Sequence, residues 1–183
     1  MEHFYQNIDG WFDFSHLYEM FVHKMQNGST IAEIGVWKGK SISYLGVLVK
    51  NSNKDIKIYA VDTWGKLETE KYHSDGCFLD DNLYKEFIKN IEPLSDVVIP
   101  CRGTSLEICQ TFPNNYFDIV FIDACHDYEC AYSDIINWLP KVKTNGIIAG
   151  HDIGFPGVSK AIAEILKPKY NINVKGEAWW VQL

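Results

Sequence analysis

Apolar residues are spaced along this chain in two ways, which predict helices and strands. Between residues 14 and 25 they recur every three or four positions, as in Phe14, Leu17, Phe21 and Met25. This spacing is typical of an amphipathic helix. Residues 30–36 then form a nearly continuous apolar run, which is typical of a buried strand. We therefore predict a helical N-terminal segment over residues 1–28, followed by the first strand.

The alternation continues to the C-terminus and predicts an α/β protein. Short apolar runs predict further strands over residues 56–61, 97–101, 117–122, 146–150, 172–175 and 178–182, and helical spacing predicts helices over residues 41–49, 83–91, 106–112, 128–139 and 158–166. This pattern predicts a seven-stranded, mostly parallel sheet with helices on both faces. No linker or repeat interrupts it, so we expect residues 1–183 to form a single domain. Residues 64–80 fit neither pattern and are a candidate substrate loop.

Polar residues and glycines follow five of the predicted strands at the point where each strand ends. They are Gly35 with Gly39, Asp62, Gly103 with Ser105, Asp123 with His126, and His151 with Asp152. In parallel sheets, ligands bind outside the carboxyl ends of the strands. We therefore expect these residues, although scattered along the sequence, to lie together at one edge of the sheet.

The turn after the first strand predicts a nucleotide-like ligand that carries an amine. Gly35 and Gly39 would let a ligand approach the main chain closely, and the N–H groups of the next helix would face it. The turn lacks the Gly-x-Gly-x-x-Gly fingerprint of dinucleotide-binding folds. Glu33 would repel a phosphate, whereas it suits the amine and sulfonium of S-adenosylmethionine (SAM).

Two more strand ends offer contacts to a nucleoside. Asp62 lies 23 positions after Gly39, where an acidic residue accepts the ribose hydroxyls in dinucleotide-binding folds. Trp64 is a candidate to flank the adenine, or else it packs within its loop. Thr104 and Ser105 could hydrogen-bond the adenine edge or cap the next helix, and the two roles are compatible.

The last two strand ends carry the candidate catalytic residues. Asp123 and Asp152, together with His151, could hold a divalent ion. Oxygen ligands suit Mg²⁺ or Ca²⁺, and imidazole shifts the preference towards Mn²⁺ or Zn²⁺. Without a metal, His126 or His151 is the candidate general base, since imidazole titrates near neutral pH. The alternative is that these side chains only tie loops together.

The composition limits the class of partner. The chain has a net charge of −7 and no long basic run, so nucleic acid is not an expected partner. No apolar run approaches the roughly 18 residues of a membrane span. The N-terminus lacks the basic start and apolar core of a signal peptide. Five cysteines without a Cys-x-x-Cys pair are interpreted as reduced thiols, so we expect a cytoplasmic protein.

With these residues identified, the chain resembles the class I SAM-dependent methyltransferases. In particular, it looks like the small family that contains macrocin-type sugar O-methyltransferases and cephalosporin-hydroxylase-like proteins. The matching segments are residues 32–41, 61–64, 121–128 and 146–152. The resemblance implies a Rossmann-like fold and implies that Glu33, Gly35, Gly39 and Asp62 bind SAM. With the residues at the other strand ends, the predicted SAM site also includes Thr63, Trp64, Thr104, Ser105 and Asp123. Some relatives bind Mg²⁺ through acids after strands four and five, which points to Asp123 and Asp152.

The hypothesis from the sequence is methyl transfer from SAM to a small-molecule acceptor, a sugar or another metabolite, most simply at an oxygen. Asp123, His126 and His151 are the candidate catalytic residues, and a divalent metal held by Asp123, His151 and Asp152 is the candidate assistant. A second subunit, in a homodimer, could complete the acceptor pocket. Three alternatives stay open: a cephalosporin-hydroxylase-like, metal-assisted protein, a non-catalytic SAM-binding module, and a NAD-dependent oxidoreductase. Glu33 and the missing fingerprint disfavour the last.

Overall fold

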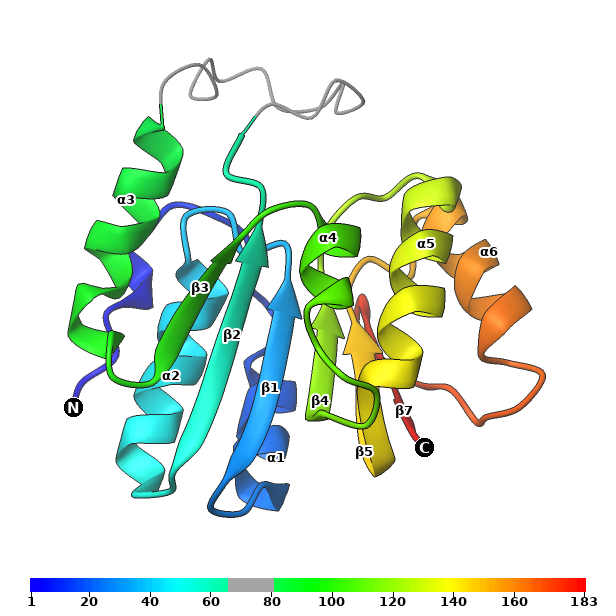
Figure 1. The fold of residues 1–183 in the computed structure, drawn as a ribbon, viewed down its shortest axis with the longest axis horizontal. Coiled ribbons are helices and arrows are strands. Elements are labelled where there is room, and N and C mark those ends of the chain that lie inside the picture. The colour runs from blue at the N-terminus through cyan, green and yellow to red at the C-terminus, as the bar shows by residue number, and fades with distance from the viewer. Residues whose placement is uncertain (66–80) are drawn as a thin grey trace.

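A twisted sheet forms the centre of the computed structural model, which describes residues 1–65 and 81–183 (Figure 1). Within these residues the sheet has seven strands in the order β3-β2-β1-β4-β5-β7-β6. Their bounds are β1 (Ser29–Ile34), β2 (Ile56–Asp62), β3 (Val98–Arg102), β4 (Phe117–Ile122), β5 (Val142–Gly150), β6 (Asn173–Lys175) and β7 (Ala178–Gln182). The first five strands are parallel, and β7 runs antiparallel to both β5 and β6.

Helices cover both faces of the sheet. One face carries α1 (Ser15–Lys24), α2 (Lys40–Ser52) and α3 (Asn82–Ile91), and the other carries α4 (Ser105–Gln110), α5 (Tyr128–Trp138) and α6 (Pro156–Ile165) (Figure 1). Short 3-10 turns lie at Tyr5–Asn7, Glu92–Leu94 and Leu139–Lys141. The fold class predicted from the sequence, an α/β sheet of seven mostly parallel strands between two helical layers, is therefore confirmed.

The core is divided by the sheet into two clusters, because successive residues of a strand point to opposite faces. On β1, Ile31 joins the cluster under α1 and α2, whereas Ala32 and Ile34 join the cluster under α5 and α6. The first cluster contains Phe14, Phe21 and Phe121, and the second contains Phe117, Trp138 and Trp179. This alternation points Glu33 into the first cluster, a position that decides its chemistry.

The strands end level with one another along one edge of the sheet. Ile34 of β1 pairs with Val61 of β2 on one side and with Ile122 of β4 on the other, and Ile122 in turn pairs with Gly150 of β5. The residues that follow these strands therefore emerge side by side. We call this the carboxyl edge, and it brings the scattered polar residues predicted from the sequence to one place.

Some boundaries differ from those predicted. β1 ends at Ile34 rather than at residue 36, because the chain turns at Gly35. β5 begins at Val142, before the predicted start at residue 146. The prediction missed the first part of this strand because polar residues such as Lys143 and Asn145 interrupt the apolar run there. Of the candidate substrate loop at 64–80, only Trp64 and Gly65 belong to the described residues, so the loop prediction lies outside them.

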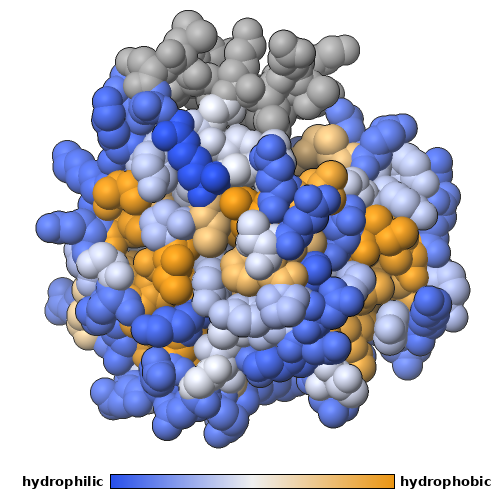
Figure 2. Space-filling view, viewed as in Figure 1, coloured by the Kyte–Doolittle hydropathy of each residue, from blue (hydrophilic) through white to orange (hydrophobic). Residues whose placement is uncertain are grey.

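The surface of the described residues is mixed in character. Viewed as in Figure 1, apolar surface forms separate patches within a polar exterior (Figure 2). Among the residues that the structure describes, no helix has the length and apolar character needed to cross a bilayer.

Candidate active site

The turn between β1 and α2 forms the first part of the carboxyl edge. Gly35 and Gly39 both adopt left-handed backbone conformations, with φ of 87° and 88°. A Cβ atom on Gly35 would lie 2.1 Å from the backbone oxygen of Asp123. Only glycine fits there, because backbone cannot move aside as a flexible side chain can. The turn is thereby packed directly against the segment that carries Asp123.

Asp62 holds this turn in place. One carboxylate oxygen of Asp62, Oδ2, accepts the backbone N–H groups of Val36 and Trp37 at 3.0 and 2.8 Å. The other, Oδ1, accepts the N–H of Trp64 at 2.8 Å. A carboxylate has about four acceptor positions, so about one remains, on Oδ1. In this arrangement Asp62 can therefore accept one ribose hydroxyl, and not both as the sequence predicted.

Glu33 lies inside the protein rather than at the edge. Its side chain is fully buried, and its two oxygens accept hydrogen bonds from the hydroxyls of Tyr18, at 2.6 Å, and Ser41. Burial raises its pKa to about 8, against the lowering effect of these two hydrogen bonds. The predicted contact between Glu33 and the amine of SAM requires an exposed, charged carboxylate, and this structure gives Glu33 neither the exposure nor, near neutral pH, the charge.

Trp64 is also buried, with 2% of its surface exposed. Its indole N–H donates to the backbone oxygen of Trp37 at 2.7 Å, and its ring lies against Phe87 with the centroids 4.4 Å apart. Of the two roles left open by the sequence, the structure shows packing and not a ring face open to an adenine. The hydroxyl of Thr63 donates to the backbone oxygen of Gly65 at 3.3 Å.

Thr104 and Ser105 serve the helix that they begin. Thr104 caps α4 in a capping box with Glu107. The Ser105 hydroxyl donates to the buried carboxyl of Asp134 and accepts the indole N–H of Trp138 at 2.8 Å. Burial raises the pKa of Asp134 to about 6, although the Ser105 hydrogen bond opposes this. Capping and helix packing therefore account for both hydroxyls, and the adenine contact has no support from the described contacts.

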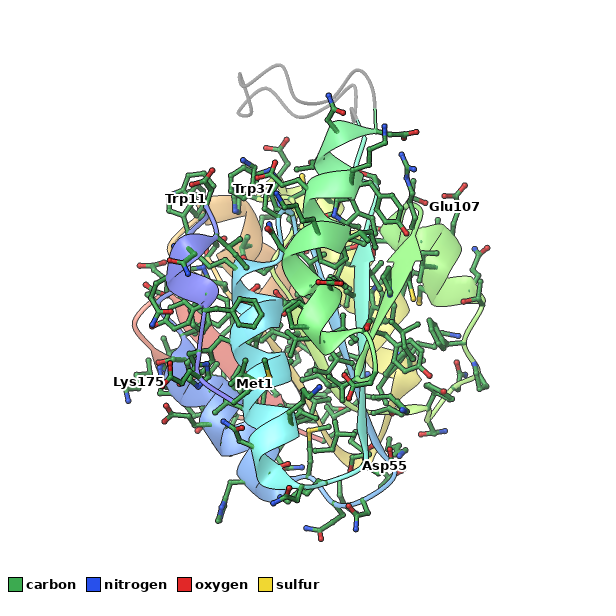
Figure 3. The ribbon with its side chains drawn as sticks, turned by 90° about the vertical axis from the view of Figure 1, so that its left-hand side faces the viewer. Met1, Trp11, Trp37, Asp55, Glu107 and Lys175 are labelled. Atoms are coloured by element: carbon green, nitrogen blue, oxygen red, sulfur yellow. The ribbon has the colours of Figure 1, made fainter. Side chains whose placement is uncertain are left out.

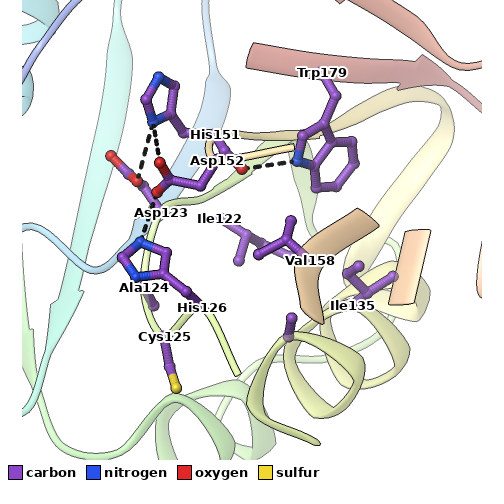
Figure 4. Close-up of a pocket in the computed structure, with 11 residues that line it drawn as sticks. Ile122, Asp123, Ala124, Cys125, His126, Ile135, His151, Asp152, Val158 and Trp179 are labelled. Carbon is purple, nitrogen blue, oxygen red and sulfur yellow. Dashed lines mark hydrogen bonds and ion pairs between the residues drawn. The ribbon is translucent and has the colours of Figure 1, made fainter. Parts of the chain in front are cut away.

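Asp123, His151 and Asp152 do come together, as the sequence predicts (Figure 4). One ligand atom from each lies within 4.8 Å of the others. Nδ1 of His151 is 3.1 Å from Oδ1 of Asp152 and 3.8 Å from Oδ1 of Asp123. Two carboxylates and an imidazole, each only partly exposed, are donors that suit a divalent ion. The residues thus fit the metal that the resemblance implies.

His126 lies on the other side of Asp152. Its Nε2 is 2.7 Å from Oδ2 of Asp152, and its ring is stacked on Phe155 with the centroids 4.4 Å apart. Phe155 follows β5 and remains 46% exposed. His126 is one of the residues that line the small hollow shown in Figure 4, and the apolar side chains of Ile122, Ala131 and Ile135 also line it.

The ionisable groups of this cluster shift one another's pKa. Burial raises the pKa of Asp123 to about 7; the charge of Asp152 adds to this, and His151 opposes it. Burial lowers the pKa of His151, but hydrogen bonding to Asp152 and the charges of Asp123 and Asp13 outweigh it and raise that pKa to about 9. Burial would raise the pKa of Asp152, yet His126 and His151 hold it well below its ordinary value. In the metal-free protein the cluster is thus a cationic imidazole among carboxyls.

Asp13 and Phe14 are part of this site but were not predicted from the sequence. Oδ1 of Asp13 lies 2.8 Å from Nε2 of His151, and the ring of Phe14 lies 4.9 Å from the imidazole, centroid to centroid. The contact joins residues 138 positions apart. The available signal was an acidic residue between two aromatic ones, Phe12 and Phe14, in the N-terminal segment.

A comparison with models of protein families identifies the family to which the chain belongs. Residues 32–153, more than half of the chain, match the model described as a methyltransferase domain. The matched region runs from β1 to the residues just after Asp152 and so contains the turn, Asp62 and the Asp123–His151–Asp152 cluster. No significant match was found among curated proteins.

Solved structures of methyltransferases have the same fold. The O-methyltransferase NovP superposes with a TM-score of 0.70 over 92% of this chain and 78% of its own, at 14% sequence identity. CalS11, described as a TDP-rhamnose 3′-O-methyltransferase of calicheamicin biosynthesis, gives 0.64 over 92% and 76%, at 14% identity. A methyltransferase from Geobacter sulfurreducens gives 0.62 over 92% and 77%, at 12% identity. At these identities the likeness establishes the fold.

Proposed function

This chain belongs to the methyltransferase domain family, and we propose that it transfers a methyl group from SAM to an oxygen of a small-molecule acceptor. The observation that carries the proposal is the packing of the Gly35 turn against Asp123. A cofactor held by the turn would lie beside the cluster of Asp123, His151 and Asp152, which carries the acid–base groups. Methyl donor and acceptor would then meet at the carboxyl edge.

The turn and Asp62 are the residues proposed to hold SAM. When bound there, SAM supplies the methyl group and, as a sulfonium, its own leaving group. Asp62 fixes the backbone of the turn through Val36 and Trp37 before any ligand arrives, and its Oδ1 keeps about one acceptor position for a ribose hydroxyl. A turn that is rigid beforehand costs less free energy to order on binding. Glu33 contributes from inside, by joining α1 to the start of α2 through Tyr18 and Ser41.

When no metal is bound, Asp123 is the residue proposed to accept the proton of the acceptor hydroxyl. A pKa near 7 suits a general base that works at neutral pH. His126, which is bonded to Asp152 through Nε2, is the second candidate for this proton. His151 is not proposed as the base, because both of its ring nitrogens already face carboxylates, those of Asp152 and Asp13. Alignment of acceptor and methyl group supplies much of the rate enhancement in such a displacement.

Asp123, Asp152 and Nδ1 of His151 are the residues proposed to hold a divalent metal. A bound metal would act as a Lewis acid and lower the pKa of a coordinated hydroxyl. The small hollow beside His126 and the exposed ring of Phe155 would form one wall of the acceptor site. Among the structural neighbours, CalS11 is described as acting on TDP-rhamnose. A sugar or a similar hydroxyl-bearing metabolite is therefore our proposed acceptor class.

The proposal is tested by isothermal titration of EDTA-treated protein with S-adenosylhomocysteine, the demethylated product of SAM. We expect micromolar binding by the wild type. Asp62→Ala removes the acceptors for Val36 and Trp37, and we expect it to weaken binding about tenfold or more. Asp55→Ala is the matched control, because Asp55 lies just before β2, at the end opposite to Trp11 and Trp37 (Figure 3).

Two results would contradict the proposal. One is no binding of S-adenosylhomocysteine by the wild type with or without Mn²⁺, and the other is an equal loss of affinity in Asp55→Ala and Asp62→Ala. A parallel titration with NAD addresses the oxidoreductase alternative. Binding of NAD in place of S-adenosylhomocysteine would favour that alternative, and the released products of turnover would separate a methyltransferase from a non-catalytic SAM-binding module.

A further inference from the structure

His151 lies between carboxylates from distant parts of the sequence. Its Nδ1 faces Asp152 and Asp123 at the carboxyl edge, at 3.1 and 3.8 Å. Its Nε2 faces Asp13, at 2.8 Å. Only 13% of the His151 side chain is exposed, so the ring has little freedom to turn. The two nitrogens therefore have separate surroundings, one inside the candidate metal cluster and one outside it.

Asp13 comes from a part of the chain that the methyltransferase match does not include. The match covers residues 32–153, whereas Asp13 precedes α1. The segment is held firmly at this point, because the next residue, Phe14, is buried and its ring packs on both Phe121 and His151. Asp13 itself is 68% exposed, so its contact with His151 does not serve the core.

This arrangement has a general parallel in metal sites. A histidine that binds a metal through one nitrogen almost always donates the N–H of its other nitrogen to a carboxylate or a carbonyl. That hydrogen bond fixes the tautomer and the orientation of the ring, and raises the basicity of the ligating nitrogen. Asp13 is placed to accept from Nε2, which would leave the lone pair of Nδ1 directed between Asp123 and Asp152.

We propose that Asp13 is a positioning residue that makes His151 a metal ligand, so that the cluster prefers Mn²⁺ to Mg²⁺. The inference rests on the metal site of the proposed function. An all-oxygen site suits Mg²⁺, whereas an imidazole ligand shifts preference towards transition metals. Asp13 would thus connect the N-terminal segment to the choice of ion.

The test uses metal-stripped, full-length protein and needs neither cofactor nor acceptor. Mn²⁺ and Mg²⁺ are titrated separately by calorimetry. We expect the wild type to bind Mn²⁺ more tightly than Mg²⁺, and Asp13→Ala to weaken Mn²⁺ binding by about 10- to 100-fold. Asp13→Asn keeps an acceptor oxygen and should recover part of the loss. Asp9→Ala is the matched control on the same segment, because Asp9 is 76% exposed and pairs with Lys38 instead of His151.

A second measurement on the wild type alone does not depend on how the variants fold. Nitrogen-15 NMR of the histidine rings, with diamagnetic Zn²⁺ as the probe, should show the metal on Nδ1 of His151 and a proton on Nε2. Metal on Nε2, equal affinities for Mn²⁺ and Mg²⁺, or unchanged Mn²⁺ binding in Asp13→Ala would overturn the inference. Titration with S-adenosylhomocysteine separates this inference from the proposed function. If the protein binds S-adenosylhomocysteine but does not prefer Mn²⁺ to Mg²⁺, the inference about Asp13 fails and the proposed function stands.

Discussion

At the scale of single residues, Glu33 and Gly35 show how one position can be set by its neighbours. Glu33 occupies a strand position that faces the core, and Gly35 follows the last residue of the same strand. Glu33 is acidic, yet its side chain is buried against Tyr18 and Ser41. Gly35 has to be a glycine because a backbone oxygen fills the space that a side chain would need. Each makes a prediction about stability that does not depend on the substrate.

Glu33 should make the protein less stable as the pH rises. Its pKa is about 8 in the folded protein and near 4.5 when unfolded, so the folded state holds a proton that the unfolded state loses between these values. The free energy of unfolding should therefore fall across this window. Glu33→Gln does not titrate, so its stability relative to the wild type should rise from pH 5 to pH 8, by at most about 5 kcal/mol. Urea unfolding at several pH values measures this, and a constant difference would contradict the burial of the charge.

Gly35→Ala should be strongly destabilising. The added methyl group would meet the backbone of Asp123 at 2.1 Å, and the residue would also have to keep a φ of 87°. Gly28→Ala is a matched control, because Gly28 has a φ of 82° and a methyl group added there would have no neighbour within 4 Å. We expect a loss of about 1 kcal/mol at Gly28, from the left-handed conformation alone, and about 3 kcal/mol or more at Gly35. Equal losses in chemical denaturation would show that the close approach is absent.

At the scale of elements, α4 and α5 are joined by a buried polar contact. Ser105 at the start of α4 donates to Asp134 and accepts from Trp138, both on α5. Asp134 is 8% exposed and Trp138 is fully buried, so neither group can turn to water when its partner is removed. Sequence analysis readily assigns a polar residue that follows a strand, such as Ser105, to ligand binding. It does not reveal that this residue contacts a later helix, because such a tertiary contact leaves no local pattern in the sequence.

Ser105→Ala should therefore reduce stability without reducing cofactor affinity. Leaving Asp134 and the Trp138 N–H without this partner should lower the free energy of unfolding by about 1–3 kcal/mol. Binding of S-adenosylhomocysteine should remain as in the wild type. Ser159→Ala, at an exposed hydroxyl on α6, provides the control for loss of a serine from a helix. If the Ser105→Ala protein folds normally but loses affinity for S-adenosylhomocysteine, the result would support the adenine contact predicted from the sequence.

At the scale of the whole molecule, the sheet and its carboxyl edge could be predicted, because both follow from local periodicity and a general rule of parallel sheets. That rule brings Asp123, His151 and Asp152 together with no knowledge of contacts. The rest depends on long-range packing. Asp13 reaches His151 across 138 positions, and Trp64 is buried against Phe87 on α3. The burial of Glu33 was accessible in principle, since strand alternation places it on the same face as Ile31.

Above all, we expect SAM to bind along the turn of Gly35 and Gly39, beside Asp123. A crystal structure of the protein with S-adenosylhomocysteine and Mn²⁺ is the decisive test. We expect the nucleoside against this turn with one ribose hydroxyl on Oδ1 of Asp62, and Mn²⁺ between Asp123, Asp152 and Nδ1 of His151. A nucleoside bound away from the carboxyl edge, or a turn with no contact to the ligand, would contradict this placement of the cofactor.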